Sequence, residues 1–156
     1  MALVGSQPSD FTITLGDLAD GSAWSSAAVS NTANGYKEAI ISVEITSHAS
    51  NAPDVGSTFD VYLLQSDDDM SDAIMDDNWA GTDASITLLN AQFLGSIEVT
   101  ADANTEFRGI FHSRDAVEAL GPEWGIAILN NTGEAIHTTD ANSFARYRYV
   151  IPDIAG

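Results

Sequence analysis

The feature of this sequence that most constrains its fold is a period-two alternation of apolar and polar residues. Within Glu38–Thr46, alternate positions carry Ala, Ile, Val and Ile, whereas the positions between them are mostly polar. Side chains of a β-strand point alternately to its two faces, so this pattern predicts a strand with one buried and one hydrated face. The alternation recurs along the chain and predicts eight strands: Asp10–Leu15, Trp24–Val29, Glu38–Thr46, Thr58–Leu64, Phe93–Val99, Glu106–His112, Trp124–Leu129 and Ser143–Ile151.

Turn residues separate these strands, and few segments could form a helix. Asn34-Gly35 precedes the strand expected at Glu38–Thr46, and Asn-Gly is a strong signal for a tight turn. Only Ser113–Leu120 and Asp72–Trp79 are candidates for one or two helical turns. About eight strands with almost no helix predict an all-β sandwich or barrel.

The alternation also predicts which side chains of two strands face the core. The expected inward residues are Phe59, Val61 and Leu63 in one strand, with Asp60 and Tyr62 opposite them, and Phe93, Gly95, Ile97 and Val99 in the other.

The length of 156 residues fits a single domain, expected over residues 10–156. The first nine residues lack alternation and contain Gly5, Ser6 and Pro8, so they are expected to form a flexible N-terminal arm. The N-terminus has no basic segment and only a short apolar run, which argues against a signal peptide. No apolar stretch approaches the ~20 residues of a membrane helix. The protein is therefore expected to be made in the cytosol and released or assembled there.

The charge balance excludes several classes of partner. The chain has 23 acidic and 5 basic residues, and its formal net charge is −18 at pH 7. Nucleic acids and anionic membrane surfaces are bound through clusters of Lys and Arg, so neither is an expected partner. The chain has no cysteine, which rules out disulfides, zinc–thiolate sites and a thiol nucleophile.

Sequence patterns that accompany catalysis are missing. The histidines, His48, His112 and His137, are widely spaced, with no HExxH or HxH pairing. No GxSxG elbow, P-loop or GxGxxG motif occurs. Among so many carboxylates some pair falls about 5–10 Å apart by chance, so their number is no evidence for glycoside hydrolysis. We therefore expect that the protein is not an enzyme.

The segment Asp67–Asp83 holds seven aspartates in seventeen residues. Calcium prefers carboxylate oxygens, so Asp67, Asp69 and Asp72 are candidate calcium ligands, although their spacing does not match an EF-hand loop. The alternative is a hydrated acidic loop that joins two strands without a metal. No other cofactor is expected.

Aromatic residues give a second candidate binding site. Three tryptophans and four tyrosines could provide a surface on which a sugar stacks. Trp124 begins an inward-alternating strand and is expected in the core. Trp79 lies in the acidic segment and is expected to be exposed, so it is the candidate ligand-binding side chain. The alternative for these residues is packing in the core or in an interface.

The last predicted strand contains two of the five basic residues. Arg146 and Arg148 alternate there with Tyr147 and Tyr149. Arginine pairs with carboxylates in a bidentate manner and, like tyrosine, is enriched at protein interfaces. These four residues are therefore a candidate subunit interface. Ion pairs within the chain, across the sheet, would explain the arginines equally well.

Three segments carry a resemblance to a known class of proteins: Ser25–Ala39, Phe93–Val99 and Pro122–Gly133. Together they resemble small all-β virion proteins of tailed double-stranded-DNA bacteriophages, which include capsid decoration (cement) and tail-associated proteins. The similarity covers roughly residues 20–150, and its motifs are turn and strand signatures rather than catalytic ones. The resemblance implies an antiparallel, jelly-roll-like sandwich of about eight strands. The acidic segment Asp67–Asp83 departs from the pattern of these proteins.

The sequence and the resemblance together predict a capsid decoration protein on the exterior of a virion. It is expected to bind the major capsid protein and stabilise the head without catalysis, as a homo-oligomer whose negative charge keeps free copies soluble. The alternative is a carbohydrate- or receptor-binding module of a tail or spike, which would use the exposed aromatic residues.

Overall fold

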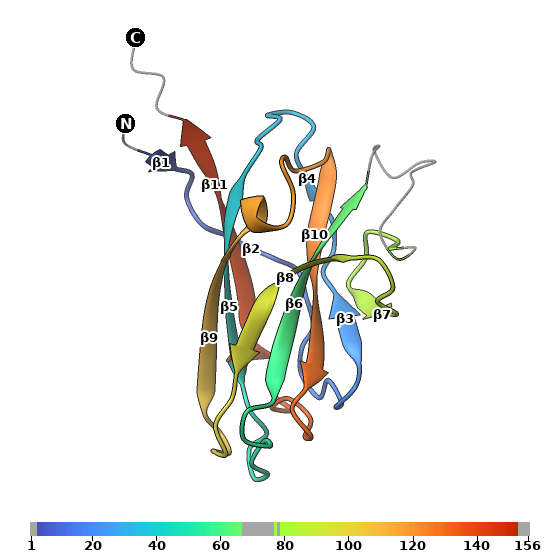
Figure 1. Ribbon diagram of the computed structural model, residues 1–156, viewed down its shortest axis with the longest axis vertical. Helices are drawn as coiled ribbons and strands as arrows, with labels where there is room; N and C mark the ends of the chain where they lie inside the picture. Colours follow the sequence, from blue (N-terminus) through green and yellow to red (C-terminus); the bar gives the residue numbers. More distant parts are fainter. Residues whose placement is uncertain (1–2, 67–76, 78, 153–156) are drawn as a thin grey trace.

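Two antiparallel β-sheets pack face to face in the computed structural model, which describes residues 3–66, 77 and 79–152 (Figure 1). In chain order the strands are β1 (Leu3–Gly5), β2 (Ser9–Asp10), β3 (Ala23–Ser25), β4 (Val29–Ser30), β5 (Ala39–Thr46), β6 (Thr58–Ser66), β7 (Ala84–Ile86), β8 (Gln92–Glu98), β9 (Glu106–His112), β10 (Glu123–Asn131) and β11 (Phe144–Pro152). One sheet has five strands, in the order β1-β11-β5-β9 with β2 also paired to β11. The other has six, in the order β7-β3-β10-β6-β8 with β4 also paired to β10. The predicted all-β sandwich is confirmed.

Eight of these strands follow the order of a jelly roll. One layer contains β2, β11, β5 and β9 in that order, and the other contains β3, β10, β6 and β8. Along the chain these strands alternate between the layers, except that β6 and β8 are neighbours in the same sheet. Double-sheet jelly rolls have eight strands in two Greek keys. The strand order therefore agrees with the jelly-roll-like sandwich that the sequence predicts.

Helix is confined, in the part of the chain that is described, to two 3₁₀ turns, η2 (Ser113–Asp115) and η3 (Asp140–Asn142). The helix expected at Ser113–Leu120 is thus a single turn, because Leu120 N donates to a carbonyl oxygen before β5 instead of continuing a helix. The turn expected at Asp72–Trp79 falls largely outside the described residues.

The strand predicted at Trp24–Val29 is split into β3 and β4. Ser26 lies at the break, where its N–H and its hydroxyl bond to the backbone of Ile126 in β10. Ala28 N then donates to Gly81 O rather than to a neighbouring strand. The sequence prediction missed this bend because the residues on both sides of it still pair with β10.

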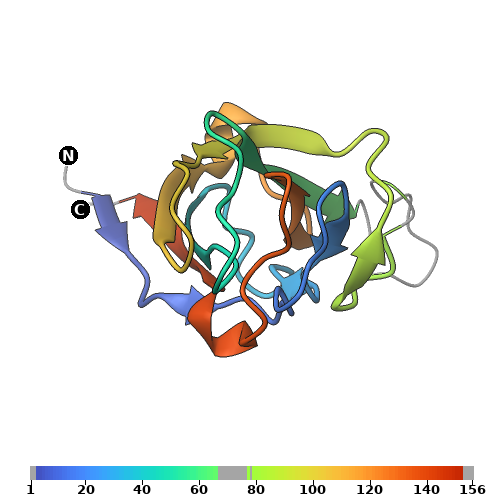
Figure 2. The same ribbon diagram turned by 90° about the horizontal axis from the view of Figure 1, so that it is seen from below.

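The strand predicted at Asp10–Leu15 is also shorter than expected. Only β2 pairs in a ladder, and the following residues cross from one sheet to the other (Figure 2). Phe11 N donates to Ala145 O of β11, whereas Thr12 O accepts from Ala27 N beside the six-stranded sheet. The alternation that suggested a strand reflects burial of every second residue of this crossing segment, without strand pairing.

The first residues of the chain belong to a sheet. β1 pairs with the last three residues of β11, and Ser9 of β2 pairs with Tyr147. Between them, Ser6 N donates to Tyr149 O and Ser6 Oγ accepts from Tyr149 N. The flexible arm predicted for residues 1–9 is therefore not found in residues 3–9. A three-residue strand is too short to show alternation, and its backbone hydrogen bonds do not depend on side-chain pattern.

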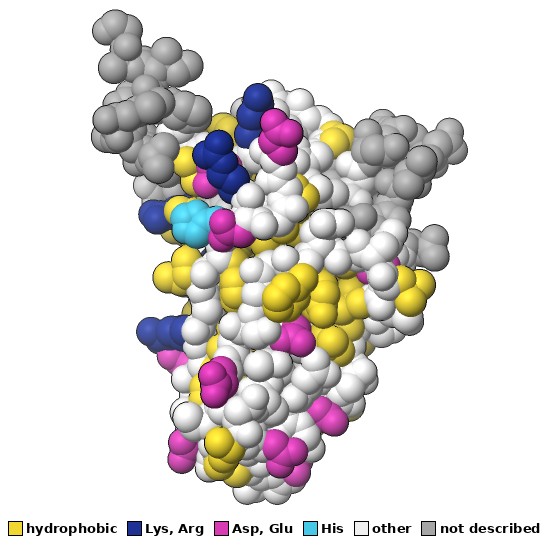
Figure 3. All heavy atoms as spheres, viewed as in Figure 1, with side chains coloured by type: hydrophobic (Ala, Val, Ile, Leu, Met, Phe, Trp, Pro, Cys, Tyr) yellow, Lys and Arg dark blue, Asp and Glu magenta, His cyan; other side chains and the backbone are white. Residues whose placement is uncertain are grey.

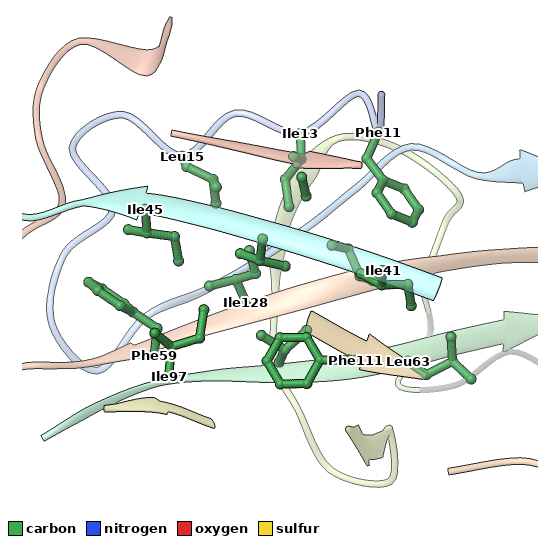
Figure 4. Packing of buried hydrophobic residues seen from close by; sticks show 14 of the residues in the cluster. Phe11, Ile13, Leu15, Ile41, Ile45, Phe59, Leu63, Ile97, Phe111 and Ile128 are labelled. Atoms are coloured by element: carbon green, nitrogen blue, oxygen red, sulfur yellow. The ribbon is translucent and has the colours of Figure 1, made fainter. Parts of the chain in front are cut away.

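The core lies between the two sheets and contains the alternate residues that the sequence predicts (Figure 4). The branched aliphatic side chains that β5, β6 and β10 bury in this core are Ile41, Val43, Ile45, Val61, Leu63, Ile126 and Ile128. Phe11, Ile13 and Leu15 of the crossing segment cover one side of this core. On the other side β8 and β9 come close together at Gly109, where a Cβ atom would lie 2.7 Å from Ile97 and from the Phe111 ring.

A β-bulge in β8 turns the side chain of Phe93 to the outer face of the sheet. The register between β6 and β8 shifts at Tyr62, so that Phe93 lies opposite Tyr62 and Leu94 is an extra residue. Phe93 consequently faces outward and is 54% exposed, while Leu94 packs against the core. The prediction that Phe93 faces inward is wrong, because one inserted residue reverses the alternation beyond it. Ile97 and Val99 are buried as predicted.

Ile128→Ala is expected to lower the free energy of unfolding by about 2–5 kcal/mol, because this side chain is fully buried in β10. Ile110→Ala makes the same chemical change at a residue that is 70% exposed, and it should alter the free energy of unfolding by less than about 0.5 kcal/mol. Urea denaturation of the two variants and the wild type measures both values. Equal losses for the two variants would contradict the placement of the core.

Candidate interaction surface

The outer face of the five-stranded sheet carries three of the five basic residues of the protein, and a fourth lies in the 3₁₀ turn that follows β9. Arg146 and Arg148 alternate with inward-facing residues of β11, and Arg108 does the same in β9. Arg114 follows directly in η2. In Figure 3 the Lys and Arg side chains gather on the side of β9 and β11, whereas Asp and Glu are spread over the visible surface. We call the outer surface of β11, β5, β9 and η2 the arginine face.

Arg108 connects two strands through a pair of carboxylates. Its Nε lies 2.6 Å from Glu44 Oε2 across the β5–β9 pair, and its other end contacts Glu106. Burial raises the pKa of Glu44, and the contact with Glu106 acts in the same direction, whereas the charge of Arg108 opposes the shift. The arginine thus holds two carboxylates together that would otherwise repel each other.

Arg146 and Arg114 are also paired, whereas Arg148 is not. Arg146 Nε donates to Asp10 Oδ1 over 2.6 Å, and Arg114 Nη1 lies 3.6 Å from Glu38 Oε2. Arg148 is exposed and forms no ion pair within the described residues. Exposed ion pairs contribute about 0–1 kcal/mol, so folding stability gives little reason for this concentration of arginines.

A shallow hollow of about 600 Å³ lies across the arginine face above β5. Ser42, in the middle of β5, lies between Arg146 of β11 and Ile110 of β9 in the register of the sheet. Its short side chain leaves space between the longer side chains on either side, which include Arg148. The hollow therefore combines cationic groups with an exposed apolar side chain.

The arginine face is close to neutral on a strongly anionic molecule. Its four arginines are nearly balanced by five carboxylates, Asp10, Glu38, Glu44 and Glu106 beside them and Asp115 of η2. The rest of the chain carries the other 18 of the 23 acidic residues and the single lysine, Lys37. Charge repulsion opposes the approach of another acidic protein least at this face.

The four residues predicted as an interface fall on two sides of the sheet. Arg146 and Arg148 face outward, whereas Tyr147 and Tyr149 pack against the core, since neighbours in a strand point to opposite faces. Tyr149 Oη accepts a hydrogen bond from Trp124 Nε1 over 3.1 Å, and burial raises the pKa of Tyr149. The two tyrosines are therefore packing residues rather than part of an exposed interface.

The structure adds Arg108 and Ile110 of β9 to the surface that contains Arg146. Alternation within Glu106–His112 indicates that both residues face away from the core. Their position beside Arg146 depends on the pairing of β9 and β11 with opposite edges of β5. Those strands are far apart in the chain, and the sequence pattern within one strand does not specify which other strand it pairs with.

Trp79 is not a surface residue. It is 2% exposed, its Nε1 donates to Ser26 O over 3.0 Å, and a Cβ atom on Gly125 would lie 2.7 Å from its ring. The tryptophan thus covers part of the outer face of the six-stranded sheet as a second, small apolar cluster. The expectation of an exposed, sugar-binding Trp79 is wrong, because the glycine in β10 provides a place where the ring packs. Trp124 is fully buried, as predicted.

The candidate calcium ligands Asp67, Asp69 and Asp72 lie outside the described residues, and calcium binding stays a prediction. Two other aspartates of the segment have structural partners. Asp77 accepts hydrogen bonds from three successive backbone N–H groups before β8, and Asp83 accepts one from a tryptophan Nε1 of β3. Among the described residues, no group of three or more His, Asp or Glu side chains is arranged to hold a metal.

No protein-family model matches the chain, and no curated protein matches its sequence. Within the described residues, no helix has both the length and the apolar character needed to cross a membrane. A function is therefore inferred from the surfaces of the sandwich.

Glu44→Gln is expected to gain stability relative to the wild type as the pH rises. The pKa of Glu44 is raised in the folded protein, so the native state binds its proton more tightly than the unfolded chain does. Glu44 therefore lowers the free energy of unfolding as the pH rises from the unfolded pKa through the raised folded pKa. Glutamine has no such titration.

Chemical denaturation at pH 4 and pH 7 measures this effect. The free energy of unfolding of the variant minus that of the wild type should be larger at pH 7 than at pH 4. Glu118→Gln, at an exposed position, is the control for loss of one charge. An identical pH dependence for the two variants would contradict the raised pKa.

Proposed function

We propose that this protein is a non-enzymatic structural protein of a bacteriophage virion, a capsid decoration protein that binds the outside of the head and stabilises it. It docks on the major capsid protein through the arginine face. The observation that carries the proposal is the concentration of four of the five basic residues on the outer face of one sheet and the 3₁₀ turn beside it, in an otherwise anionic jelly roll. The resemblance of Ser25–Ala39 and Pro122–Gly133 to virion proteins of tailed phages supports it, as does the use of jelly rolls in viral capsid domains.

The chemistry of the arginine face favours an acidic segment of the shell protein as the group that docks there. Arg148 is exposed and, among the described residues, has no carboxylate partner of its own. A guanidinium binds a carboxylate through two parallel hydrogen bonds, which fixes orientation as well as affinity. Ile40, which lies opposite Arg148 in the register of the sheet, and Ile110 of β9 line the same hollow and add apolar contact area. A shell segment with a carboxylate next to an apolar side chain matches both.

The remaining surface suits a position on the outside of a particle. Outside the arginine face the chain carries 18 acidic residues and one lysine. Like charge keeps free copies apart and soluble before they bind the shell. Homo-oligomerisation stays a prediction, and contacts between neighbouring copies on the shell are one way in which it arises.

Purified virions of the phage that encodes this chain are expected to contain on the order of hundreds of copies, in a simple ratio to the major capsid protein. Quantitative mass spectrometry of the particles measures this ratio. A handful of copies would contradict head decoration and favour the tail- or spike-associated alternative. Absence from the particles would contradict any role in the virion.

Arg148→Glu is expected to weaken binding to heads that lack this protein at least tenfold, about 1.4 kcal/mol or more, because it reverses the charge offered to an acidic segment. Lys37→Glu makes the same change in net charge at an exposed residue outside the hollow and should bind like the wild type. Co-sedimentation with heads measures both, and wild-type binding should weaken as salt screens the contact. Equal binding of the two variants would exclude the arginine face as the docking surface.

A further inference from the structure

The bulge in β8 creates an exposed aromatic pair on the outer face of the six-stranded sheet. Phe93 is 54% exposed and lies opposite Tyr62 of β6. The centres of the two rings are 5.5 Å apart and their planes meet at 64°, so the rings form an open corner rather than a stack. Figure 3 shows hydrophobic side chains gathered over β8 and β6. We call Tyr62 and Phe93 the aromatic corner.

Hydrogen-bonding side chains adjoin the aromatic corner on the same face. Asp60 and Tyr62 are two residues apart in β6, so their side chains point to the same side of the sheet. Asp60 Oδ1 accepts a hydrogen bond from Ser96 Oγ over 2.6 Å, and Oδ2 accepts one from Asn131 Nδ2 over 2.9 Å. These contacts hold a carboxylate, a hydroxyl and an amide in place at the surface, beside an exposed ring.

We propose that the aromatic corner and the Asp60–Ser96–Asn131 cluster form a binding site for a neutral glycan. A hexopyranose ring packs its C–H face on Phe93, because the face of an aromatic ring carries partial negative charge and C–H groups are weakly positive. The sugar hydroxyls donate to the carboxylate of Asp60, which is an acceptor only, and accept from the amide of Asn131.

Tyr62 supplies a further polar group at this site. The hydroxyl of Tyr62 is protonated at neutral pH, as that of an ordinary tyrosine is, and can donate to a sugar oxygen. Burial and the charge of Asp60 raise the pKa of Tyr62 further. A tyrosine with an apolar ring and a polar tip suits a ligand whose faces are apolar and whose rim carries hydroxyls.

The charge of this face favours a neutral glycan over an anionic ligand or a second copy of the chain. Asp60 and Glu98 lie on it, whereas the four arginines of the protein lie on the arginine face. An anionic ligand would therefore be repelled. A second copy that docked through the same patch about a two-fold axis would bring these carboxylates towards their own counterparts, which opposes association. A neutral polyhydroxyl ligand has no charge that these carboxylates would repel.

This inference does not depend on the proposed docking on a capsid. The aromatic corner and the arginine face are on the outer faces of different sheets of the sandwich. Glycan binding is measured on the free protein, so glycan binding can fail while head binding succeeds. Head binding can likewise fail while glycan binding succeeds. Arg148→Glu, which tests the arginine face, should leave glycan binding unchanged.

Isothermal titration of the full chain with maltohexaose, cellohexaose, chitohexaose and mannohexaose tests the proposal. At least one of these is expected to bind with a Kd in the millimolar range or tighter. Phe93→Ala should weaken that binding at least tenfold, whereas Phe93→Tyr keeps the ring and should retain it within about threefold. Val55→Ala removes a different exposed apolar side chain, 78% exposed, and should leave binding unchanged. Thermal melting of each variant checks that it is folded.

Four results would overturn the proposal. The first is no binding of any of the four hexasaccharides at millimolar concentration. The second is unchanged affinity in a folded Phe93→Ala variant. The third is dimerisation of the wild type that Phe93→Ala abolishes, measured by sedimentation, since the patch would then be an interface between copies. NMR shifts of the Phe93 and Tyr62 ring protons on glycan addition give a measurement that needs no variant, and unshifted rings in the presence of binding would also overturn it.

Discussion

Burial of one face of every long strand between the two sheets is the constraint on which the rest of this structure depends. Side chains such as Ile41, Val61 and Ile128 fill the space between the layers, so the alternate residues of the same strands point to the outer faces. Most of these residues meet solvent, except where Trp79 covers the outer face of the six-stranded sheet. A strand-borne binding surface can therefore lie only on the two outer faces or at the edges. In this protein the two outer faces differ in chemistry: one concentrates arginines, and the other presents an aromatic pair beside a carboxylate.

The acidic residues also contribute to the fold of the connections. A jelly roll with almost no helix has many loop N–H groups that need acceptors. Asp140 Oδ1 accepts from two successive backbone N–H groups, those of Leu15 and Gly16, and Asp20 accepts from Gly133 N. Carboxylates accept such bonds strongly because they are charged. Part of the negative charge is therefore placed where the backbone turns, and it serves the structure as well as solubility.

Most strands and their inward faces could be predicted from the sequence, whereas contacts between distant segments could not. The strand expected at Glu38–Thr46 coincides with β5 except for its first residue, because four apolar inward positions leave no ambiguity about its faces. The outward position of Phe93 depends on a bulge that exists only in the pairing with β6. The burial of Trp79 depends on Gly125, a residue of another strand. Sequence periodicity describes one strand at a time, and these features belong to pairs of segments.

The same limit explains which parts of the candidate sites were predictable. Arg146 and Arg148 were recognisable as one outward-facing pair within a single strand, but their grouping with Arg108 requires the order β11-β5-β9. Tyr62 was expected to face outward, and only the bulge brings an exposed phenylalanine beside it. In both places the missing information was the register between strands. Register is set by the whole core, since a slip of one residue would expose one buried face.

The separation of the two surfaces also determines what kind of ligand each can take. In the proposed docking, the nearly neutral arginine face is covered by a shell, and the surface that remains exposed holds almost all of the net charge of −18. That charge attracts cationic ligands and repels anionic ones, and repulsion between like charges is screened only beyond about 8 Å at physiological ionic strength. Stacking on Phe93 and hydrogen bonds to Asp60 and Asn131 act at contact and need no opposite charge on the ligand. An aromatic corner is thus the means by which an anionic particle surface can still hold a neutral ligand.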